Sequence, residues 1–482
     1  MTPTVFLAVR GGFTPRFLLR TDILPTLRAK GVRVVILSPN ADETYFRKEF
    51  EAEDVFVEKL EVARLEAYAA SRPGQRVLRT LRLQISSGRA DLTTIEQMAA
   101  INEDTARKRG LRGFVTSRAL RVMTQLARRS RLVREIITRS ESALFTPTFH
   151  GPLYNKYRPQ AVVVTSLGFS GSEPDNYLMR EARHFGAKVI ASVLSWDNTS
   201  SKGLRGGPVD HAIAWTDVMK EELKAYHDIP ADRITVCGPP HFDAYYRPGG
   251  WSRDEMFTRL GLDPARKLLT FATKSPTNYP WNEEIAEMIG RAVADGRIVE
   301  PCQLLVRLHP IYYRQRDGQY KFQPFLERAR DLARRYRCIT IDEPQIVSRT
   351  LALDMPHDEM NKVLAILKHS SVFLNIYSTM NLEAAIVDTP CVNISFNGTE
   401  GSPDLRKNVA LDEVQPHNQR VVQSGGVAMV RSEAEMIDAI NAYLRDPGLH
   451  REGRRRIRER ECGRYPGTAG VAVGETIARL VA

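Results

Sequence analysis

The sequence has no run of about 18 apolar residues, the length that a helix needs to cross a bilayer. Its first ten residues enter a short strand-like run without the basic segment and apolar core of an export signal. Cysteine is scarce, and its five residues lack the close pairs of a zinc site or a disulfide framework: Cys237, Cys302, Cys338, Cys391 and Cys462. These absences predict a protein of the reducing cytoplasm, soluble or peripheral to a membrane.

The chain is too long for a single hydrophobic core. At 482 residues, the length favours two or three domains. The content of 43% hydrophobic and 26% charged residues is that of a globular protein. We therefore expect two lobes.

The net charge of +12 is concentrated in one segment. Residues 62–145 hold 17 Arg or Lys against 7 Asp or Glu, a net of +10. From Phe114 to Thr138 the basic residues alternate with apolar ones at helical spacing. This pattern fits a helical insert that binds an anionic membrane surface or polyanion, or a helix that packs its apolar stripe on its own domain with a solvated arginine face. Nucleic acid is disfavoured, because interleaved aromatics and a known binding module are both missing.

The first half of the chain alternates strands and helices. Val5–Val9 and Val32–Leu37 read as strands on either side of a helix, and the pattern resumes after the insert at Ala161–Thr165 and Lys188–Val193. Such alternation predicts a parallel sheet with helical crossovers. We assign residues 1–246 to an N-terminal Rossmann-like domain that includes the insert 62–145.

A Pro- and Gly-containing segment, Arg247–Gly250, marks the boundary, and a second alternating pattern starts near Lys267. Expected strands there include 268–273, 303–308 and 371–376. We assign residues 255–465 to a C-terminal Rossmann-like domain and residues 466–482 to a terminal helix. The predicted fold class is α/β, with two tandem doubly wound parallel sheets.

The stretch from Asn375 to Ala385 is the most informative of the second domain. It reads as the end of a buried strand, a hydroxyl-bearing turn with Ser378 and Thr379, and a helix that carries Glu383. A helix N-terminus offers unpaired N–H groups to an anion, and ligands of open α/β sheets bind at the carboxyl ends of the strands. The alternative is an ordinary Ser/Thr helix cap.

Two further strand ends of this domain carry similar groups. Lys274 and Ser275 follow one strand, and Arg307 and His309 end the next. Together with the serine-containing turn they predict a cradle for a diphosphate, in which Arg307 supplies a fixed charge and His309 a donor that can become cationic. A packed histidine before a proline turn is the alternative for His309.

These segments resemble those of GT-B glycosyltransferases. More narrowly, Arg307–Pro310 and Tyr377–Ala385 look like donor-site motifs of bacterial surface-polysaccharide transferases, and CDP-glycerol glycerophosphotransferases carry similar segments. Ser195–Gly203, with Asp210 and Gly238–Asp243, is similar to segments in uncharacterised members of that group. The resemblance covers most of residues 155–400 but not the basic insert. The glycine-rich form of the serine-containing turn, common among such transferases and sugar 2-epimerases, is absent, so the nucleobase is left open.

The resemblance implies a nucleotide-activated sugar or polyol donor as substrate, no separate cofactor, and a glycan or lipid-linked acceptor. The expected donor-binding residues are Lys274, Ser275, Arg307, His309, Ser378, Thr379 and Glu383, with Glu383 on the ribose. Transfer to a hydroxyl needs a base, for which Asp197 is the first choice and Asp175 the second. Each has a structural alternative: Asp175 as a helix cap or first-turn acid, and Asp197 as a residue that orders its loop. His309 is included among the catalytic candidates.

No metal site is expected, because Asp354, His357 and Asp358 read as capping residues before a helix, and the resemblance implies metal-independent turnover. Three reactions fit the same fold: glycosyl transfer, polyol-phosphate transfer and epimerisation of a nucleotide sugar. A fourth possibility is a binding protein for anionic surfaces in which the cleft is degenerate.

Overall fold

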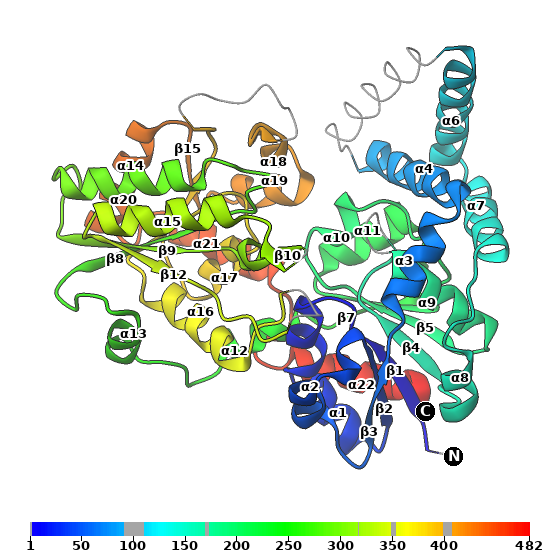
Figure 1. Cartoon of the computed structure of the whole chain (residues 1–482). Helices are drawn as coiled ribbons and strands as arrows, with labels where there is room; N and C mark the ends of the chain where they lie inside the picture. Colours follow the sequence, from blue (N-terminus) through cyan, green and yellow to red (C-terminus); the bar gives the residue numbers. More distant parts are fainter. Residues whose placement is uncertain (1, 91–109, 169–172, 317, 349–352, 399–406) are drawn as a thin grey trace. The chain divides into compact units, whose positions relative to one another are not determined.

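The computed structural model describes residues 2–90, 110–168, 173–316, 318–348, 353–398 and 407–482. The chain divides into two compact units (Figure 1). The first comprises Met1–His241 and Gly463–Ala482, and the second Phe242–Cys462. The C-terminal segment therefore belongs to the first unit.

Within the described residues, the first unit is built on a seven-stranded parallel sheet of order β3-β2-β1-β4-β5-β6-β7. Its strands are β1 (Thr4–Ala8), β2 (Arg33–Ser38), β3 (Val55–Lys59), β4 (Ala161–Val164), β5 (Lys188–Ser192), β6 (His211–Ala214) and β7 (Ile234–Val236). The central strands are buried on both faces, which explains their continuous apolar sequences.

Helices connect these strands. They are α1 (Ile23–Ala29), α2 (Thr44–Phe50), α3 (Val62–Ala70), α4 (Pro73–Arg89), α6 (Leu111–Arg129), α7 (Arg131–Leu144), α8 (Gly151–Tyr157), α9 (Glu173–His184), α10 (Asn198–Ser201), α11 (Asp217–His227) and α22 (Ala469–Val481). The C-terminal helix α22 packs on α1, where a Cβ at Gly474 would come within 2.7 Å of the Thr26 side chain. Small residues at this contact let the two helices approach closely.

The second unit has a six-stranded parallel sheet of order β12-β9-β8-β13-β14-β15 in its described part. The strands are β8 (Lys267–Ala272), β9 (Cys302–Arg307), β12 (Ile339–Asp342), β13 (Val372–Asn375), β14 (Cys391–Ile394) and β15 (Ala428–Val430). A short antiparallel ribbon joins β10 (Gln315–Arg316) to β11 (Gln319–Tyr320). The expected α/β class with two doubly wound parallel sheets is confirmed.

Helices cover both faces of the second sheet (Figure 1). They are α12 (Asp243–Tyr246), α13 (Arg253–Leu260), α14 (Asn282–Ala294), α15 (Gln323–Arg335), α16 (His357–His369), α17 (Met380–Ile386), α18 (Ala410–Glu413), α19 (Pro416–Gln423), α20 (Glu433–Arg445) and α21 (Arg451–Glu461). Alternate residues of β9 serve the two faces: Leu304 and Val306 pack with α14, α15 and α20, whereas Leu305 packs with α13 and α16.

The basic insert forms α3, α4, α6 and α7 in the described residues. Its own core contains Leu81, Ile85, Ala127 and Ile137, which pack against Leu204 of the first unit. The insert is thus packed on its own domain through one face, as one of the two interpretations of its sequence predicts. None of the helices in the described ranges is both long and apolar enough to span a bilayer.

Candidate functional site

The strand order of the second sheet brings the predicted binding segments together. From the central strand β8 the chain moves outward to β9 and β12, then returns to the other side of β8 at β13. The order reverses between β8 and β13, and ligands of such sheets bind outside the carboxyl ends of the strands at this switch point. The predicted segments 273–275, 307–309 and 378–379 follow the three adjacent strands β8, β9 and β13.

Hydrogen bonds join the ends of β8 and β9. The Thr273 N–H donates to the Arg307 carbonyl at 3.0 Å, and the His309 N–H donates to Thr273 Oγ1 at 2.8 Å. The turn after β8 is closed by Asn282, which accepts from the Lys274 N–H and donates to the carbonyls of Lys274 and Tyr279. The positions of Lys274 and Ser275 are therefore fixed by the backbone around them.

His309 is a neutral donor in this arrangement. Its Nδ1 accepts from the Ile311 N–H at 3.1 Å, which assigns the ring proton to Nε2. Burial, with the nearby charges of Arg307 and Lys274, lowers the pKa of His309 to about 4. The imidazole is uncharged at pH 7, and the cationic form that the sequence suggested does not form in the structure as it stands.

Arg307 is not available as an open phosphate ligand. It is 5% exposed, its Nη2 lies 2.9 Å from Glu359 Oε1, and its Nη1 is bonded to Asp342. Lys362 Nζ pairs with the same two carboxylates at 2.8 and 2.9 Å. Two cations and two anions thus form a closed buried cluster, so the guanidinium fork is already used. Arg307, two residues before His309, instead joins the end of β9 to Asp342 of β12 and to Glu359 of α16.

Lys274 supplies the remaining cation of the cradle. Its Nζ lies 2.5 Å from Asp412 Oδ2, and its side chain is 16% exposed. Ser275 lies beside it, with its carbonyl accepting the N–H groups of Asn278 and Tyr279 at 2.9 Å. Lys274 is a plausible ligand only for an anion that competes with Asp412.

The serine-containing turn after β13 is strained and internally hydrogen-bonded. Tyr377 has a φ of +45°, a left-handed conformation that a bulky side chain seldom adopts. Its N–H donates to Asn393 Oδ1 at 2.9 Å, and the Ser378 N–H donates to Asn375 Oδ1 at 3.1 Å. The side chain of Asn381 links the two accepting side chains, because it accepts from Asn375 Nδ2 and donates to Asn393 Oδ1. This buried amide network, which the sequence did not reveal, holds the strained turn in place.

Backbone N–H groups of this turn that could bind an anion are already hydrogen-bonded within it. The Met380 N–H donates to Ser378 Oγ at 3.2 Å, and helix α17 is only seven residues long. Thr379 occupies the cap position without a side-chain cap bond. The hydroxyl protons of Ser378 and Thr379, rather than a row of open amides, are the groups that this turn offers to a phosphate.

Glu383 lies one helical turn further on and is 5% exposed. The Tyr245 hydroxyl, from the start of the same unit, donates to Glu383 Oε2. A ribose diol would have to share or displace this bond. The predicted ribose contact of Glu383 stays a prediction, and the structure gives the carboxylate a second role in joining α12 to α17.

Glu283 is a group at this site that the sequence reasoning missed. It opens α14 directly after the turn that follows β8, and Tyr312, next to His309-Pro310 in the chain, donates to its Oε1 at 2.9 Å. Burial raises the pKa of Glu283 to about 7. A carboxyl that changes charge near neutral pH beside a sheet switch point is a candidate for proton transfer. In the sequence it looks like an ordinary first-turn acid.

In the first unit, Asp175 lies at the corresponding place. That sheet reverses between β1 and β4; Arg10 follows β1, and Asp175 is the third residue of the helix after β4. Arg10 Nε lies 3.6 Å from Asp175 Oδ1, and Asp175 is 1% exposed. The pair spans the switch point, as a ligand-binding pair would.

Asp197 has a different setting. Ser195 Oγ donates to its Oδ1 at 2.6 Å, Ser201 Oγ donates to its Oδ2, and Lys202 Nζ lies 3.0 Å from Oδ2. These bonds tie residues 195–202 together. Asp197 thus orders its loop, and its role as a base stays a prediction. The neighbouring Trp196 and Asn198 are buried.

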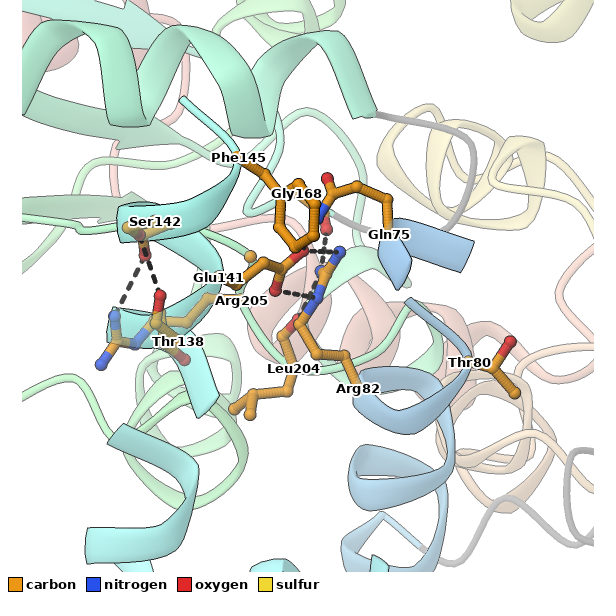
Figure 2. Close-up of polar contacts among 12 residues, drawn as sticks. Gln75, Thr80, Arg82, Thr138, Glu141, Ser142, Phe145, Gly168, Leu204 and Arg205 are labelled. Carbon is orange, nitrogen blue, oxygen red and sulfur yellow. Dashed lines mark hydrogen bonds and ion pairs between the residues drawn. The ribbon is translucent and has the colours of Figure 1, made fainter. Parts of the chain in front are cut away.

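The basic insert contacts the loop after β4 through a buried ion cluster (Figure 2). Glu141 on α7 lies 3.1 Å from Arg82 Nε on α4, as Figure 2 shows. Arg180 Nη2 on α9 lies 2.7 Å from the same carboxylate. Arg82 Nη1 donates to the Gly168 carbonyl, just after β4. Some arginines of the insert are thus internal, and Arg82 holds Gly168, which follows β4.

The described residues contain no cluster of three or more His, Cys, Asp or Glu side chains that could bind a metal ion. Among Asp354, His357 and Asp358, His357 is the first residue of α16. The cap residue of this helix is Pro356, which makes no side-chain cap bond. Asp358 lies in the first turn of the helix, as a first-turn acid does.

No protein-family model matches the chain, and no curated protein matches it. Solved structures do. The Staphylococcus aureus MnaA–UDP structure has a TM-score of 0.53 and 11% identity, over 97% of this chain and 94% of that chain. A Rickettsia africae glycosyltransferase has a TM-score of 0.50 and 10% identity, covering 100% and 98%. A UDP-N-acetylglucosamine 2-epimerase has a TM-score of 0.50 and 12% identity, over 99% of this chain and 96% of that chain. At such identities the likeness shows the fold alone: the chain has two Rossmann-like sheets in the GT-B arrangement of domains along the sequence.

Proposed function

We propose that the chain is a metal-independent glycosyltransferase that moves a sugar from a nucleotide-activated donor to a hydroxyl of a cell-surface glycan or lipid-linked acceptor. The observation that carries the proposal is the meeting of Thr273, His309 and Ser378 at three adjacent strand ends beside the switch point of the second sheet. That is where this class of sheet binds nucleotides. The structural neighbour from S. aureus was solved with UDP, which supports a nucleoside diphosphate as the donor's leaving group.

In this proposal the diphosphate is held mainly by neutral donors. His309 offers its Nε2–H, and Ser275, Ser378 and Thr379 offer hydroxyl protons. Fixed donors stabilise the charge that builds on a leaving diphosphate without solvent reorganisation. Lys274 adds a positive charge at the same edge if it leaves Asp412 for the phosphate.

For the base, we propose Asp175 ahead of Asp197. Asp175 lies at the switch point of the first sheet, paired with Arg10, whereas Asp197 bonds to groups of its own loop. An acceptor would have to open the buried Arg10–Asp175 pair to reach the carboxylate. In the proposed reaction the carboxylate accepts the proton of the acceptor hydroxyl as the oxygen attacks the anomeric carbon. The basic insert would bring the first unit to an anionic membrane surface at the cytoplasmic side, where a lipid-linked acceptor lies.

The first test is a thermal-shift screen against UDP, CDP, GDP, UMP and CMP, since a ligand that binds only the folded state raises the melting temperature. A shift with one diphosphate that is lost in His309→Ala supports the donor site. No shift with any nucleotide argues against it. Incubation of the matching nucleotide sugar without acceptor then separates the alternatives: interconversion of two sugars indicates an epimerase, and activity confined to CDP-glycerol indicates a polyol-phosphate transferase.

A further inference from the structure

The outward face of α6 is apolar. Val115, Val122 and Leu126 are 57%, 58% and 53% exposed and recur at i, i+7 and i+11, which places them on one side of the helix. Thr124 and Ala127, on the opposite side, are buried. The apolar stripe of α6 therefore points away from the core that the helix shares with its own domain.

The exposed stripe continues onto α7. After the single residue Ser130, Leu132 and Ile136 are 69% and 53% exposed. Eight of the fifteen large hydrophobic side chains that are exposed in the described residues belong to the insert, 62–145. Figure 1 shows α6 and α7 along the outer side of the first unit. Exposed apolar side chains gathered in this way indicate an interaction surface.

The charge of this face has one sign. Helix α6 contains five arginines and no acidic residue. Arg129 at its end is exposed, and no ion-pair partner for its side chain occurs in the described part of the chain. A second copy of the same face would bring like charges together, so self-association through it is disfavoured. An anionic bilayer satisfies both the apolar stripe and the arginines.

A cavity of about 290 Å³ lies next to this face. One wall is formed by Arg131, Glu135 and Arg139, which repeat every four residues on α7. Arg205 and Arg233 also line it. On the helix surface, the exposed Leu132 and Ile136 each lie three positions before a cavity residue, Glu135 and Arg139. Residues at this spacing are neighbours on one face, so the cavity lies beside the apolar edge.

The acidic groups of the cavity are already neutralised. Glu135 lies 2.8 Å from Arg205 Nη2 and 3.1 Å from Arg139 Nε. Asp228, also at the cavity wall, accepts from Arg134 with both oxygens at 2.6 Å. The side chains of Arg131 and Arg233 have no ion-pair partner within the described ranges, so the cavity carries excess positive charge. Guanidinium groups arranged in this way suit a phosphate.

We propose that the α6–α7 face docks on an anionic phospholipid bilayer, with its apolar side chains in the interface and a lipid headgroup phosphate in the arginine-lined cavity. The proposal rests on the part of the proposed function that brings the insert to a membrane, and it is independent of the donor chemistry. It adds a defined headgroup site, which the net charge of the insert alone does not imply.

The test is co-sedimentation of the full chain with phosphatidylcholine vesicles, with or without roughly one-third phosphatidylglycerol, at about 0.1 M salt. We expect binding only to the anionic vesicles, with at least a roughly fivefold loss in Val122→Ser/Leu126→Ser and in Arg131→Gln/Arg233→Gln. Val299→Ser/Val414→Ser and Arg337→Gln/Arg445→Gln are matched controls, since they change exposed residues of the second unit. The controls should bind like the wild type.

Melting curves and nucleotide-induced shifts of each variant separate a loss of docking from misfolding and from failure of the donor site. Equal binding to neutral and anionic vesicles, or unchanged binding of both insert variants, overturns the proposal. So does a rise in melting temperature with sodium pyrophosphate that depends on Arg131 and Arg233 while vesicles do not bind, because the cavity would then serve a soluble phosphate.

Discussion

The backbone N–H of His309 donates to Thr273 Oγ1 at 2.8 Å and so ties together the ends of two neighbouring strands. The imidazole of His309 accepts from the Ile311 N–H, which leaves Nε2 as its donor. The Thr273 hydroxyl in turn bonds to the Tyr312 side chain. This local contact thereby holds the His309 donor at the switch point of the second sheet.

His309→Ala should weaken nucleoside diphosphate binding about tenfold, because one hydrogen bond to a charged phosphate contributes about 1.5 kcal/mol or more. The measurement is a dissociation constant from calorimetric titration. His309→Gln, which keeps an N–H donor, should bind more tightly than His309→Ala. His184→Ala, at an exposed histidine of the first unit, is the control. Unchanged binding in His309→Ala would remove this residue from the donor site.

Arg307→Met should destabilise the fold by about 3–5 kcal/mol, because it leaves Asp342 and Glu359 buried with Lys362 as their only cation. Urea denaturation measures this loss. Adding Glu359→Gln should recover part of the stability, since it removes one of the two buried negative charges. A stable Arg307→Met protein with a specific loss of nucleotide binding would restore Arg307 as a phosphate ligand.

The strands and turns that carry the candidate site could be predicted because their signals are local. Apolar runs mark β8, β9 and β13, and the groups after them are adjacent in the chain. The short strands β14 (CVNI) and β15 (AMV) carry no comparable signal, because three or four residues give little pattern and β14 is interrupted by the polar Asn393.

The state of the side chains could not be predicted, because it depends on distant residues. Arg307 is neutralised by carboxylates 35 and 52 positions away, and Glu383 is engaged by Tyr245, 138 positions away. Burial of Glu283 likewise depends on the packing of η5 (Pro310–Tyr313) against α14, which no local pattern shows. The sequence places chemical groups at the sheet edge, but their charge and availability follow from tertiary contacts.

Glu283 should make the stability of the protein depend on pH near neutrality. Its folded pKa of about 7 is raised above the value of 4.5 for an exposed Glu, so the native state binds more protons between these two values. The stabilising contribution is fully present below about pH 4.5 and is lost as the pH rises to 7, with an upper limit of about 3 kcal/mol. Glu283→Gln should remove this dependence, and Glu284→Gln should retain it, in urea denaturation across this range. A wild-type profile that matches Glu283→Gln would contradict the raised pKa.

Removal of divalent metal ions should leave turnover unchanged. The proposed stabilisation of the leaving diphosphate uses N–H and O–H donors and Lys274 rather than a metal ion. Release of the nucleotide from its sugar conjugate is measured after dialysis against EDTA, with and without added Mg²⁺ or Mn²⁺. Loss of more than about tenfold of the rate, restored by one of these ions, would replace this part of the proposal by metal-assisted departure.

Asp175→Asn and Asp197→Asn should separate the base from the loop-ordering residue. Asparagine keeps the size of the side chain but cannot accept the acceptor's proton at neutral pH, so Asp175→Asn should bind nucleotide normally and lose at least about a hundredfold in turnover. Asp197→Asn loses the ion pair with Lys202 and should lower the melting temperature while it retains measurable turnover. Asp210→Asn is a control for an acidic residue of the same unit, since it also forms an ion pair, with Arg183. Full activity of Asp175→Asn together with an inactive, well-folded Asp197→Asn would return the role of base to Asp197, because only removal of the reacting carboxylate stops turnover without loss of stability.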